Sequence, residues 1–363
     1  MYENLGIIVM NNCKEFGEQV INYIKKDLKI ESDIKIPISE VRFSNGEGKV
    51  VIDSSVRNKD IYIISDIGNY NCTYKMFGFD NHMGPDEHYQ DIKRTICAVR
   101  NYAENVTLIM PLLYESRQHR KNGRESLDCS LALQELEQMG IRNFITFDVH
   151  DPDLQNAIPM SDLVNLYPTS MVLTDLLQNE NLDSELIVVS PDTGAFGRAR
   201  YYADALNASG FKANVAICHK RRDLTKIVDG KNPIIAHEYI GQDPKGKIAI
   251  VTDDLIASGT SMLDVAKELK NRLVEKTYLV TTFPLFTSGL KEFDEANKLG
   301  IFEKIYSTNL TYTSDELKER KWFNQSDCSK YLAEVIETLY QKDQLSPTLN
   351  ESKVLNKTLK KYK

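Results

Sequence analysis

Short apolar runs recur along the chain and alternate with segments that have a different hydrophobic period. Most of these runs are four to six residues long and rich in Ile and Val. That pattern is typical of parallel strands whose two faces are both covered. It predicts strands at Leu5–Met10, Ile61–Ile64, Val106–Met110, Phe144–Phe147, Leu186–Val189, Ala213–Cys218, Ile248–Val251 and Thr277–Thr282.

The segments between the apolar runs include two clear amphipathic patterns. In Cys129–Met139 and Ser261–Leu269, apolar side chains return about every three to four positions, which predicts helices with one buried face. Because strands and helices alternate over the whole length, we expect an α/β protein of mainly parallel sheets flanked by helices.

The alternating pattern runs through the chain twice, with a break between Asp151 and Tyr167 that contains two prolines. At roughly 150 residues per domain, 363 residues correspond to two domains. We predict domains at 1–160 and 161–340, followed by a Lys-rich tail at 341–363. The segment Asn69–Asp86, rich in Gly, Asn and aromatic residues, is predicted to be a surface excursion at a subunit contact or elsewhere.

Composition excludes several classes of protein. The 45 Lys and Arg against 52 Asp and Glu give a net charge of −7, which argues against a general nucleic-acid binder. No apolar stretch reaches the roughly 18 residues of a membrane span, and the first residues lack the basic region of a signal peptide. The six cysteines never approach a CxxC spacing. We therefore expect a cytoplasmic protein with reduced thiols.

One segment carries the most specific chemistry. Lys247–Leu269 reads as a buried strand, the acid pair Asp253 and Asp254, a loop of small residues and a helix. Backbone N–H groups at the helix N-terminus can converge on a phosphate, and the acid pair suits neighbouring sugar hydroxyls. A ribose 5-phosphate site is predicted, and an ordinary capped helix is the alternative. The predicted phosphate loop consists of Ala257, Ser258, Gly259, Thr260 and Ser261.

This segment resembles the phosphoribosyl-pyrophosphate loop of type I phosphoribosyltransferases. Further motifs follow one another in the order found in ribose-phosphate pyrophosphokinases, so the chain resembles that family over roughly residues 5–340. The resemblance implies two tandem phosphoribosyltransferase-like domains. The motifs are Arg42–Glu47, Ser116–Lys121, Phe147–His150, Val189–Gly194 with Arg198–Arg200, and Lys220–Arg222.

The resemblance also implies a reaction: the diphosphoryl group of ATP is transferred to the C1 hydroxyl of ribose 5-phosphate, giving 5-phosphoribosyl 1-pyrophosphate and AMP for nucleotide biosynthesis. Such a transfer depends on alignment and charge neutralisation, so cations and Mg²⁺ ligands are expected. The family uses Mg²⁺. It commonly assembles as homo-oligomers, often hexamers, with ATP near a subunit contact.

Individual roles follow from the motif matches. Lys220 and Arg222 are implied to be catalytic, at the start of a mobile loop. His150 and Asp192 are implied to bind Mg²⁺. Alternatives remain for several positions, because a solvated basic loop, a hairpin turn at Asn45-Gly46 and an Asx turn at Asp192 explain the same residues. ATP is implied to bind Phe43, Asn45, Glu47, Arg117 and Gln118, and ribose 5-phosphate Asp192, Asp253, Asp254 and Ala257–Ser261.

Two departures from the family pattern leave other functions open. Ala257 stands where the family loop usually has an acid, and His119 stands where the ATP motif usually has Asp. A non-catalytic regulatory subunit of a synthetase is therefore one alternative. Another is a phosphoribosyltransferase that consumes phosphoribosyl pyrophosphate with a nucleobase. The Arg117-Gln118 motif and the basic triplet at Lys220 argue against this second alternative, because such transferases need no ATP site.

Overall fold

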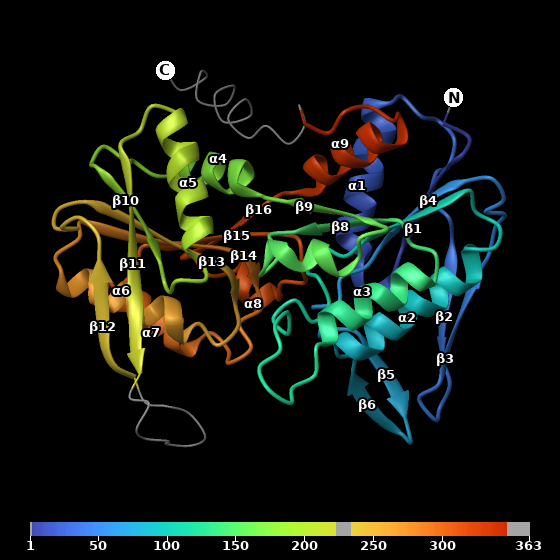
Figure 1. Cartoon of the computed structure of the whole chain (residues 1–363), viewed down its shortest axis with the longest axis horizontal. Helices are drawn as coiled ribbons and strands as arrows, with labels where there is room; N and C mark the ends of the chain where they lie inside the picture. The colour runs from blue at the N-terminus through green and yellow to red at the C-terminus, as the bar shows by residue number, and fades with distance from the viewer. Residues whose placement is uncertain (1, 223–233, 347–363) are drawn as a thin grey trace. The chain divides into compact units, whose positions relative to one another are not determined.

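The structure is a computed structural model that describes residues 2–222 and 234–346 (Figure 1). These residues form two compact units. The first comprises the chain up to Tyr167, Asn309–Tyr312 and the segment that begins at Asp327. The second comprises Pro168–Thr308 and Thr313–Ser326.

A parallel five-stranded sheet forms the centre of the first unit. Its helices cover both faces, α1 and α9 on one and α2 and α3 on the other (Figure 1). The strands, in spatial order, are β1 (Leu5–Val9), β4 (Asp60–Ile64), β7 (Asn105–Ile109), β8 (Asn143–Phe147) and β9 (Asp162–Leu166). The helices are α1 (Lys14–Asp27), α2 (Pro85–Val99), α3 (Asp128–Gln138) and α9 (Ser329–Tyr340), with short 3-10 turns η1 (Asn11–Cys13) and η2 (Pro152–Ala157).

Two antiparallel hairpins stand apart from this sheet. The first contains the Asn45-Gly46 turn, as the turn alternative predicted, and Gly46 has a φ of 92° there. The second lies within the segment Asn69–Asp86, predicted as a surface excursion. The hairpins pair β2 (Ile38–Arg42) with β3 (Gly48–Ile52), and β5 (Thr73–Met76) with β6 (Phe79–His82).

A seven-stranded sheet forms the centre of the second unit, and all its neighbours are parallel except β11 and β12. Helices α4 and α5 cover one face, and α6, α7 and α8 cover the other (Figure 1). In spatial order the strands are β12 (Ile234–Ile240), β11 (Ala213–Arg222), β10 (Leu186–Ser190), β13 (Ile248–Ile256), β14 (Lys276–Pro284), β15 (Lys304–Thr308) and β16 (Phe323–Ser326). The helices are α4 (Thr169–Asn179), α5 (Phe196–Ala208), α6 (Thr260–Asn271), α7 (Lys291–Lys298) and α8 (Asp315–Lys318).

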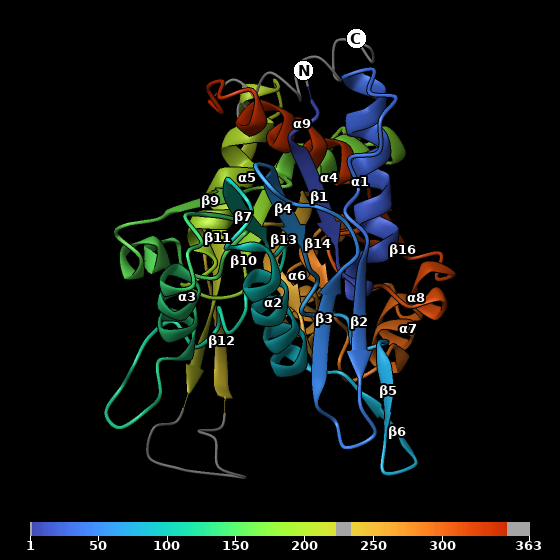
Figure 2. The same ribbon diagram turned by 90° about the vertical axis from the view of Figure 1, so that its right-hand side faces the viewer.

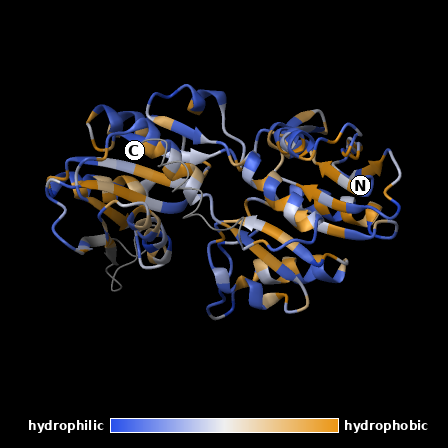
Figure 3. Ribbon diagram, turned by 90° about the horizontal axis from the view of Figure 1, so that it is seen from above, coloured by the Kyte–Doolittle hydropathy of each residue, from blue (hydrophilic) through white to orange (hydrophobic). Residues whose placement is uncertain are grey.

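The hydrophobic core of the second unit has two layers, one on each face of the sheet. Apolar residues dominate the strands, whereas the helices alternate hydrophobic and hydrophilic positions (Figure 3). One layer contains an aromatic cluster of Phe286, Phe293, Phe302 and Trp322, whose ring centroids lie 4.8 to 6.3 Å apart. Burial on both faces is the reason that these strands read as continuous apolar runs.

The α/β prediction and the eight predicted strands are confirmed, as are the two predicted helices. Strand β13 extends five residues past the predicted end at Val251, because it continues to pair with β14 as far as Ile256. Within the two sheets, strands β9, β12, β15 and β16 were not predicted, since their sequences mix polar and apolar residues.

The predicted domain limits stay a prediction. The compact units are divided differently, because each combines segments from separate parts of the chain. Helix α9 packs against α1, so the segment from Asp327 belongs to the first unit. Most of the predicted Lys-rich tail, 347–363, lies outside the described residues. Among the described helices, none combines the length and the apolarity needed to cross a bilayer.

Candidate active site

The predicted ribose 5-phosphate residues lie together at one edge of the second unit's sheet. Strands β10 and β13 are neighbours and parallel, so their carboxyl ends meet at that edge. Asp192 follows β10, Asp253 and Asp254 lie near the end of β13, and the phosphate loop follows directly. Ligands of open α/β sheets bind at this edge.

The turn between β13 and α6 is built around a glycine that no other residue can replace without strain. Gly259 has a φ of 79°, and a Cβ added there would lie 2.1 Å from the ring of Phe293. Within the described chain, helix α6 has neither a capping side chain nor an acidic residue in its first turn. The hydroxyls of Ser258 and Thr260 lie 3.2 Å apart beside it. An anion is the natural partner of such a helix N-terminus.

Backbone N–H groups orient the acid pair just before this turn. Asp254 is buried, and its Oδ1 accepts a hydrogen bond from the N–H of Leu255 at 2.8 Å. Asp253 Oδ1 accepts from the N–H of Asp254 at 3.0 Å, and Arg198 Nη1 lies 3.9 Å from the same oxygen. Burial and the neighbouring Asp254 raise the pKa of Asp253, although Arg198 opposes the shift. A hydroxyl or cation that approached these carboxylates would relieve this repulsion.

The side chain of Asp192 closes a local turn, in line with the Asx turn given above as the alternative explanation of this residue. Its Oδ1 accepts a hydrogen bond from the N–H of Ala195 at 3.0 Å, just before α5 begins. The hydroxyl of Ser190 donates to the carbonyl of Asp192 and fixes the loop. Asp192 is exposed, and its charge contributes to the raised pKa of Asp253. Its predicted roles toward Mg²⁺ and ribose stay predictions.

The predicted catalytic residues come from the strand on the other side of β10. The backbone of Lys220 and Arg222 belongs to β11, where it pairs with His237 and Ile234 of β12. Their side chains, and the loop predicted to begin with this triplet, lie outside the described residues. Their catalytic roles stay predictions.

The predicted adenine-binding residues form the tip of the β2–β3 hairpin. The N–H of Phe43 donates to the carbonyl of Glu47 at 2.8 Å, and Asn45 Nδ2 donates to Glu47 Oε2 at 2.8 Å. The ring of Phe43 is 45% exposed, so one face is open to a ligand. The turn satisfies its own backbone, which is the hairpin explanation of these residues. Nucleotide binding there stays a prediction.

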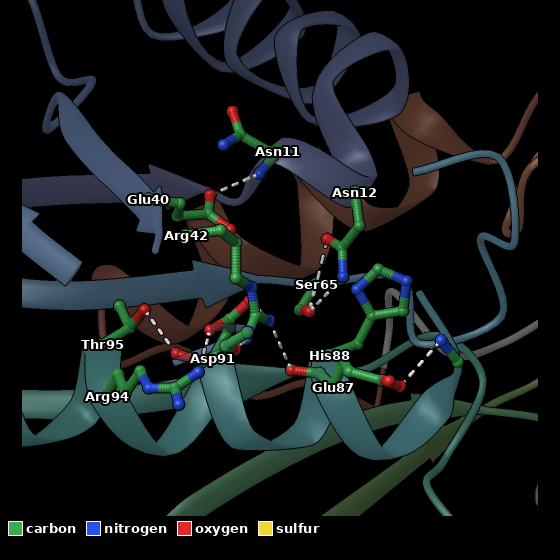
Figure 4. Close-up of polar contacts among 12 residues, drawn as sticks. Asn11, Asn12, Glu40, Arg42, Ser65, Glu87, His88, Asp91, Arg94 and Thr95 are labelled. Atoms are coloured by element: carbon green, nitrogen blue, oxygen red, sulfur yellow. Dashed lines mark hydrogen bonds and ion pairs between the residues drawn. The ribbon is translucent and has the colours of Figure 1, made fainter. Parts of the chain in front are cut away.

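An ion-pair cluster around the buried Asp91 attaches this hairpin to α2 beside its turn (Figure 4). Asp91 accepts from Arg42 at 2.5 Å and from Arg94 at 2.6 Å, and its side chain is 6% exposed. Nearby, Glu40 accepts from the N–H of Asn11 at 2.7 Å, and burial raises its pKa to about 7. Asp91 was not among the predicted residues, because nothing in its local sequence distinguishes it from a surface helix acid.

The other predicted ATP residues lie in the loop between β7 and α3. Gln118 Nε2 donates to the carbonyl of Ser126 at 3.0 Å, so this side chain closes the loop. Arg117 is exposed. The ring of Tyr114, earlier in the loop, stacks on Tyr89 of α2 with centroids 4.2 Å apart. The loop is therefore docked on α2 and presents Arg117 to solvent.

Helix α2 separates the two predicted ATP segments within this chain. The hairpin packs against α2 through Asp91, and the basic loop packs against it through Tyr89 (Figures 1 and 2). In both views α2 lies between β2–β3 and α3. The structure therefore brings the ribose candidates to one sheet edge, whereas the hairpin that carries Phe43 and the loop that carries Arg117 each pack on α2 through different residues.

His150 follows β8 and is exposed, next to Asp148, which has an unusual φ of 41°. Its ring lies 5.2 Å from that of His119, centroid to centroid. Asp151 Oδ2 is 3.3 Å from His119 Nε2 and 3.0 Å from Arg120 Nη2. Burial would raise the pKa of Asp151, but hydrogen bonds from the N–H of Asp153 and from Arg120 lower it overall.

The predicted Mg²⁺ ligands fit a metal held mainly by a nucleotide. Among residues 2–222 and 234–346, no group of three or more His, Cys, Asp or Glu side chains is arranged to hold a metal ion. Mg²⁺ in phosphoryl-transfer sites takes one or two protein ligands, with phosphates and water completing the octahedron. His150 is exposed beside the basic loop, which suits such a role.

Two residues of the site were missed by sequence reasoning. Arg198 lies in a motif that had been recognised but had no assigned role, and its position opposite Asp253 required the tertiary structure. Phe293 packs under Gly259 from 34 positions further along the chain, so no local signal could have identified it.

The fold and the turn after β13 define a phosphoribosyltransferase-type α/β protein. The model of the "Phosphoribosyl transferase domain" matches residues 162–312, and that of the "N-terminal domain of ribose phosphate pyrophosphokinase" matches residues 5–140. Together these matches cover most of the sequence. The chain belongs to the ribose-phosphate pyrophosphokinase family.

Individual relatives agree with this assignment. Ribose-phosphate pyrophosphokinase 1 of Listeria monocytogenes is 28% identical over 328 residues, 89% of each chain. The ribose-phosphate pyrophosphokinase of Bacillus subtilis is 26% identical over 348 residues, 95% of this chain and 96% of the relative. The crystal structure of phosphoribosylpyrophosphate synthetase from Mycobacterium smegmatis has a similar fold, with a TM-score of 0.76 and 22% identity over 94% of this chain and 100% of that one.

Proposed function

We propose that this protein transfers the diphosphoryl group of ATP to the C1 hydroxyl of ribose 5-phosphate and releases AMP. The observation that carries the proposal is the turn at Gly259, where the Phe293 ring packs closely against the backbone and the acid pair lies just before the turn. In this proposal the 5-phosphate binds the N–H groups of Ser258–Ser261, and Asp253 and Asp254 accept hydrogen bonds from the ribose hydroxyls.

The remaining roles follow the family motifs. Lys220 and Arg222 neutralise the charge that develops on the transferred phosphoryl groups, and Arg117 binds the ATP phosphates. Asp192 helps to orient the ribose. Bound Mg²⁺ would supply further positive charge to the polyphosphate. His150 would hold the Mg²⁺ of MgATP, and Asp192 would hold a second Mg²⁺ or the ribose hydroxyls. We place this activity in the cytoplasm, as part of nucleotide biosynthesis.

The direct test is AMP release from ATP, measured with and without ribose 5-phosphate and with Mg²⁺ present. We expect release that depends on the sugar phosphate. Lys220→Ala should lower kcat by orders of magnitude, because the side chain acts mainly in the transition state. Lys245→Ala, an exposed lysine outside the site, is the matched control and should leave kcat unchanged.

We also propose that a second copy of the chain completes the ATP site. The support is the position of α2 between the Phe43 hairpin and the Arg117 loop. Phe43→Ala and Arg117→Ala should each inactivate the protein alone, and mixing the two should restore part of the activity in shared sites. Mixtures that stay as inactive as their components, in an oligomer shown to exchange subunits, would rule this out.

A regulatory, non-catalytic role is the second candidate, and Ala257 and His119 are the residues that favour it. Absence of turnover at micromolar protein, together with altered activity of an added synthetase, would support that role. Base-dependent nucleotide synthesis would instead indicate a phosphoribosyltransferase.

A further inference from the structure

The pair of imidazoles at His119 and His150 is a feature that the proposed reaction does not by itself require. His119 lies in the basic loop after β7, and His150 follows β8. Because β7 and β8 are adjacent parallel strands, their following loops meet at one edge of the sheet. The two rings lie 5.2 Å apart, centroid to centroid, at 57° to each other.

Asp151 determines which nitrogen of His119 is available. His119 Nε2 lies 3.3 Å from Asp151 Oδ2, so we assign the proton of the neutral ring to Nε2. The lone pair is then on Nδ1. Asp151 is itself held by Arg120 and by the N–H of Asp153, which fixes the orientation of the imidazole. A carboxylate that orients one histidine nitrogen while the other binds metal is a recurrent arrangement in metalloproteins.

His119 Nδ1 is buried and has no hydrogen-bond partner within the described part of the chain. A buried acceptor without a partner is destabilising, so such atoms call for a specific explanation. A ligand that accepts this lone pair would remove the cost. The side chain is 14% exposed, so an ion from solvent can reach its surroundings.

We propose that His119 and His150 together bind one divalent transition-metal ion, with water or nucleotide phosphate completing its coordination. Two imidazoles favour Co²⁺, Ni²⁺ or Zn²⁺ over Mg²⁺, which prefers oxygen ligands. His119 thus supplies a nitrogen ligand at a position where the ATP motif of the family usually has Asp. The inference deepens the proposed function and rests on it for the placement of nucleotide phosphate beside His150.

The test uses the full chain and Co²⁺ alone, without ATP or ribose 5-phosphate. We expect one Co²⁺ per chain with a visible d–d absorption band, and at least a hundredfold excess of Mg²⁺ needed to displace it. His119→Gln keeps an amide donor for Asp151 but loses the imidazole, so Kd should rise at least tenfold. His82→Gln removes a surface histidine that contacts the carbonyl of Tyr70, and it should bind Co²⁺ like the wild type.

Unchanged Co²⁺ affinity in His119→Gln, equal weakening in His82→Gln, or absence of stoichiometric binding by the wild type would each overturn the inference. If His119→Gln does not fold, by circular dichroism, Asp151→Asn replaces it, with an expected 10- to 100-fold loss of affinity. Because no substrate is present, Co²⁺ binding without AMP release would reject the proposed reaction alone, and AMP release without Co²⁺ binding would reject this inference alone.

Discussion

At the two ends of the sheet in the second unit, carboxylates have opposite surroundings. Near the amino ends of β14 and β15, Glu180 accepts from the hydroxyls of Tyr278 and Tyr306, each at 2.8 Å, and pairs with Lys304 at 2.7 Å. At the opposite end, Asp253 lies against Asp254, and the cation Arg198 is 3.9 Å away.

The pKa values express this difference. Burial alone would raise the pKa of Glu180, but hydrogen bonds from Lys304, Tyr278 and Tyr306 lower it. Burial and a like charge raise the pKa of Asp253. Glu180 is therefore stabilised as a carboxylate by its neighbours, whereas the surroundings of Asp253 disfavour its charge, as is frequent at functional sites. Stability and binding should thus separate cleanly when the two ends are mutated.

The strongest test of the carboxyl end is Gly259→Ala. The positive φ and the contact with Phe293 should together lower the free energy of unfolding by about 2–4 kcal/mol and abolish measurable ribose 5-phosphate binding. Gly289→Ala is the matched control, because Gly289 has the same φ of 79° with nothing within 4 Å of an added Cβ. Chemical denaturation and calorimetric titration check both. Equal effects in the two variants would contradict the role that we give to the close contact between Gly259 and Phe293.

The amino end is tested by Glu180→Ala, which leaves two buried tyrosine hydroxyls without their acceptor. The free energy of unfolding should fall by about 3 kcal/mol, with KM unchanged. Since the folded pKa of Glu180 is lowered, its stabilisation is present above the unfolded carboxyl pKa and is lost as pH falls through the folded value. Glu185→Ala removes a glutamate whose side chain is 41% exposed and pairs with Lys212 and Lys247, and it should change stability little. A change in KM for Glu180→Ala would contradict the proposed separation.

Asp253→Asn should weaken substrate binding without lowering stability, the reverse of Glu180→Ala. KM for ribose 5-phosphate is expected to rise about 10- to 100-fold, as expected when a charged hydrogen-bond acceptor is lost, while stability at neutral pH stays equal or increases. The raised folded pKa means that the native state binds more protons, so wild-type stability falls as pH rises from the unfolded pKa through the folded one. The variant should lack this fall. Denaturation curves at several pH values test this difference. A variant less stable than the wild type at neutral pH would contradict the view that ionised Asp253 destabilises the folded state.

The smallest effect is expected from Ala257→Asp, which restores the acid usual in the family loop. Ala257 is partly buried, and its carbonyl accepts from the N–H of Thr287, so the backbone of the turn should be retained. We expect kcat/KM for ribose 5-phosphate to rise by a few-fold. Steady-state kinetics would detect it, and a loss of activity would indicate that the small side chain is itself required.

The sequence was sufficient to predict the strand, turn and helix that bring the ribose 5-phosphate candidates together, but not how the candidate ATP residues of the first unit are arranged. Strand β13, its acid pair and α6 are contiguous, so one local pattern contained the whole phosphate turn. The buried triad of Arg42, Asp91 and Arg94 joins residues 49 positions apart, and hydrophobic periodicity carries no information about such pairs. For the same reason the sequence did not predict that α2 would divide Phe43 from Arg117.

Helix α9 also has a consequence for how the protein is made. It packs against α1 in the first unit, although the chain completes most of the second unit before reaching it. The ribosome therefore synthesises α1 long before α9, the helix that packs on it. Until Asp327 and the residues after it have been synthesised, the face of α1 that packs on α9 lacks its partner helix.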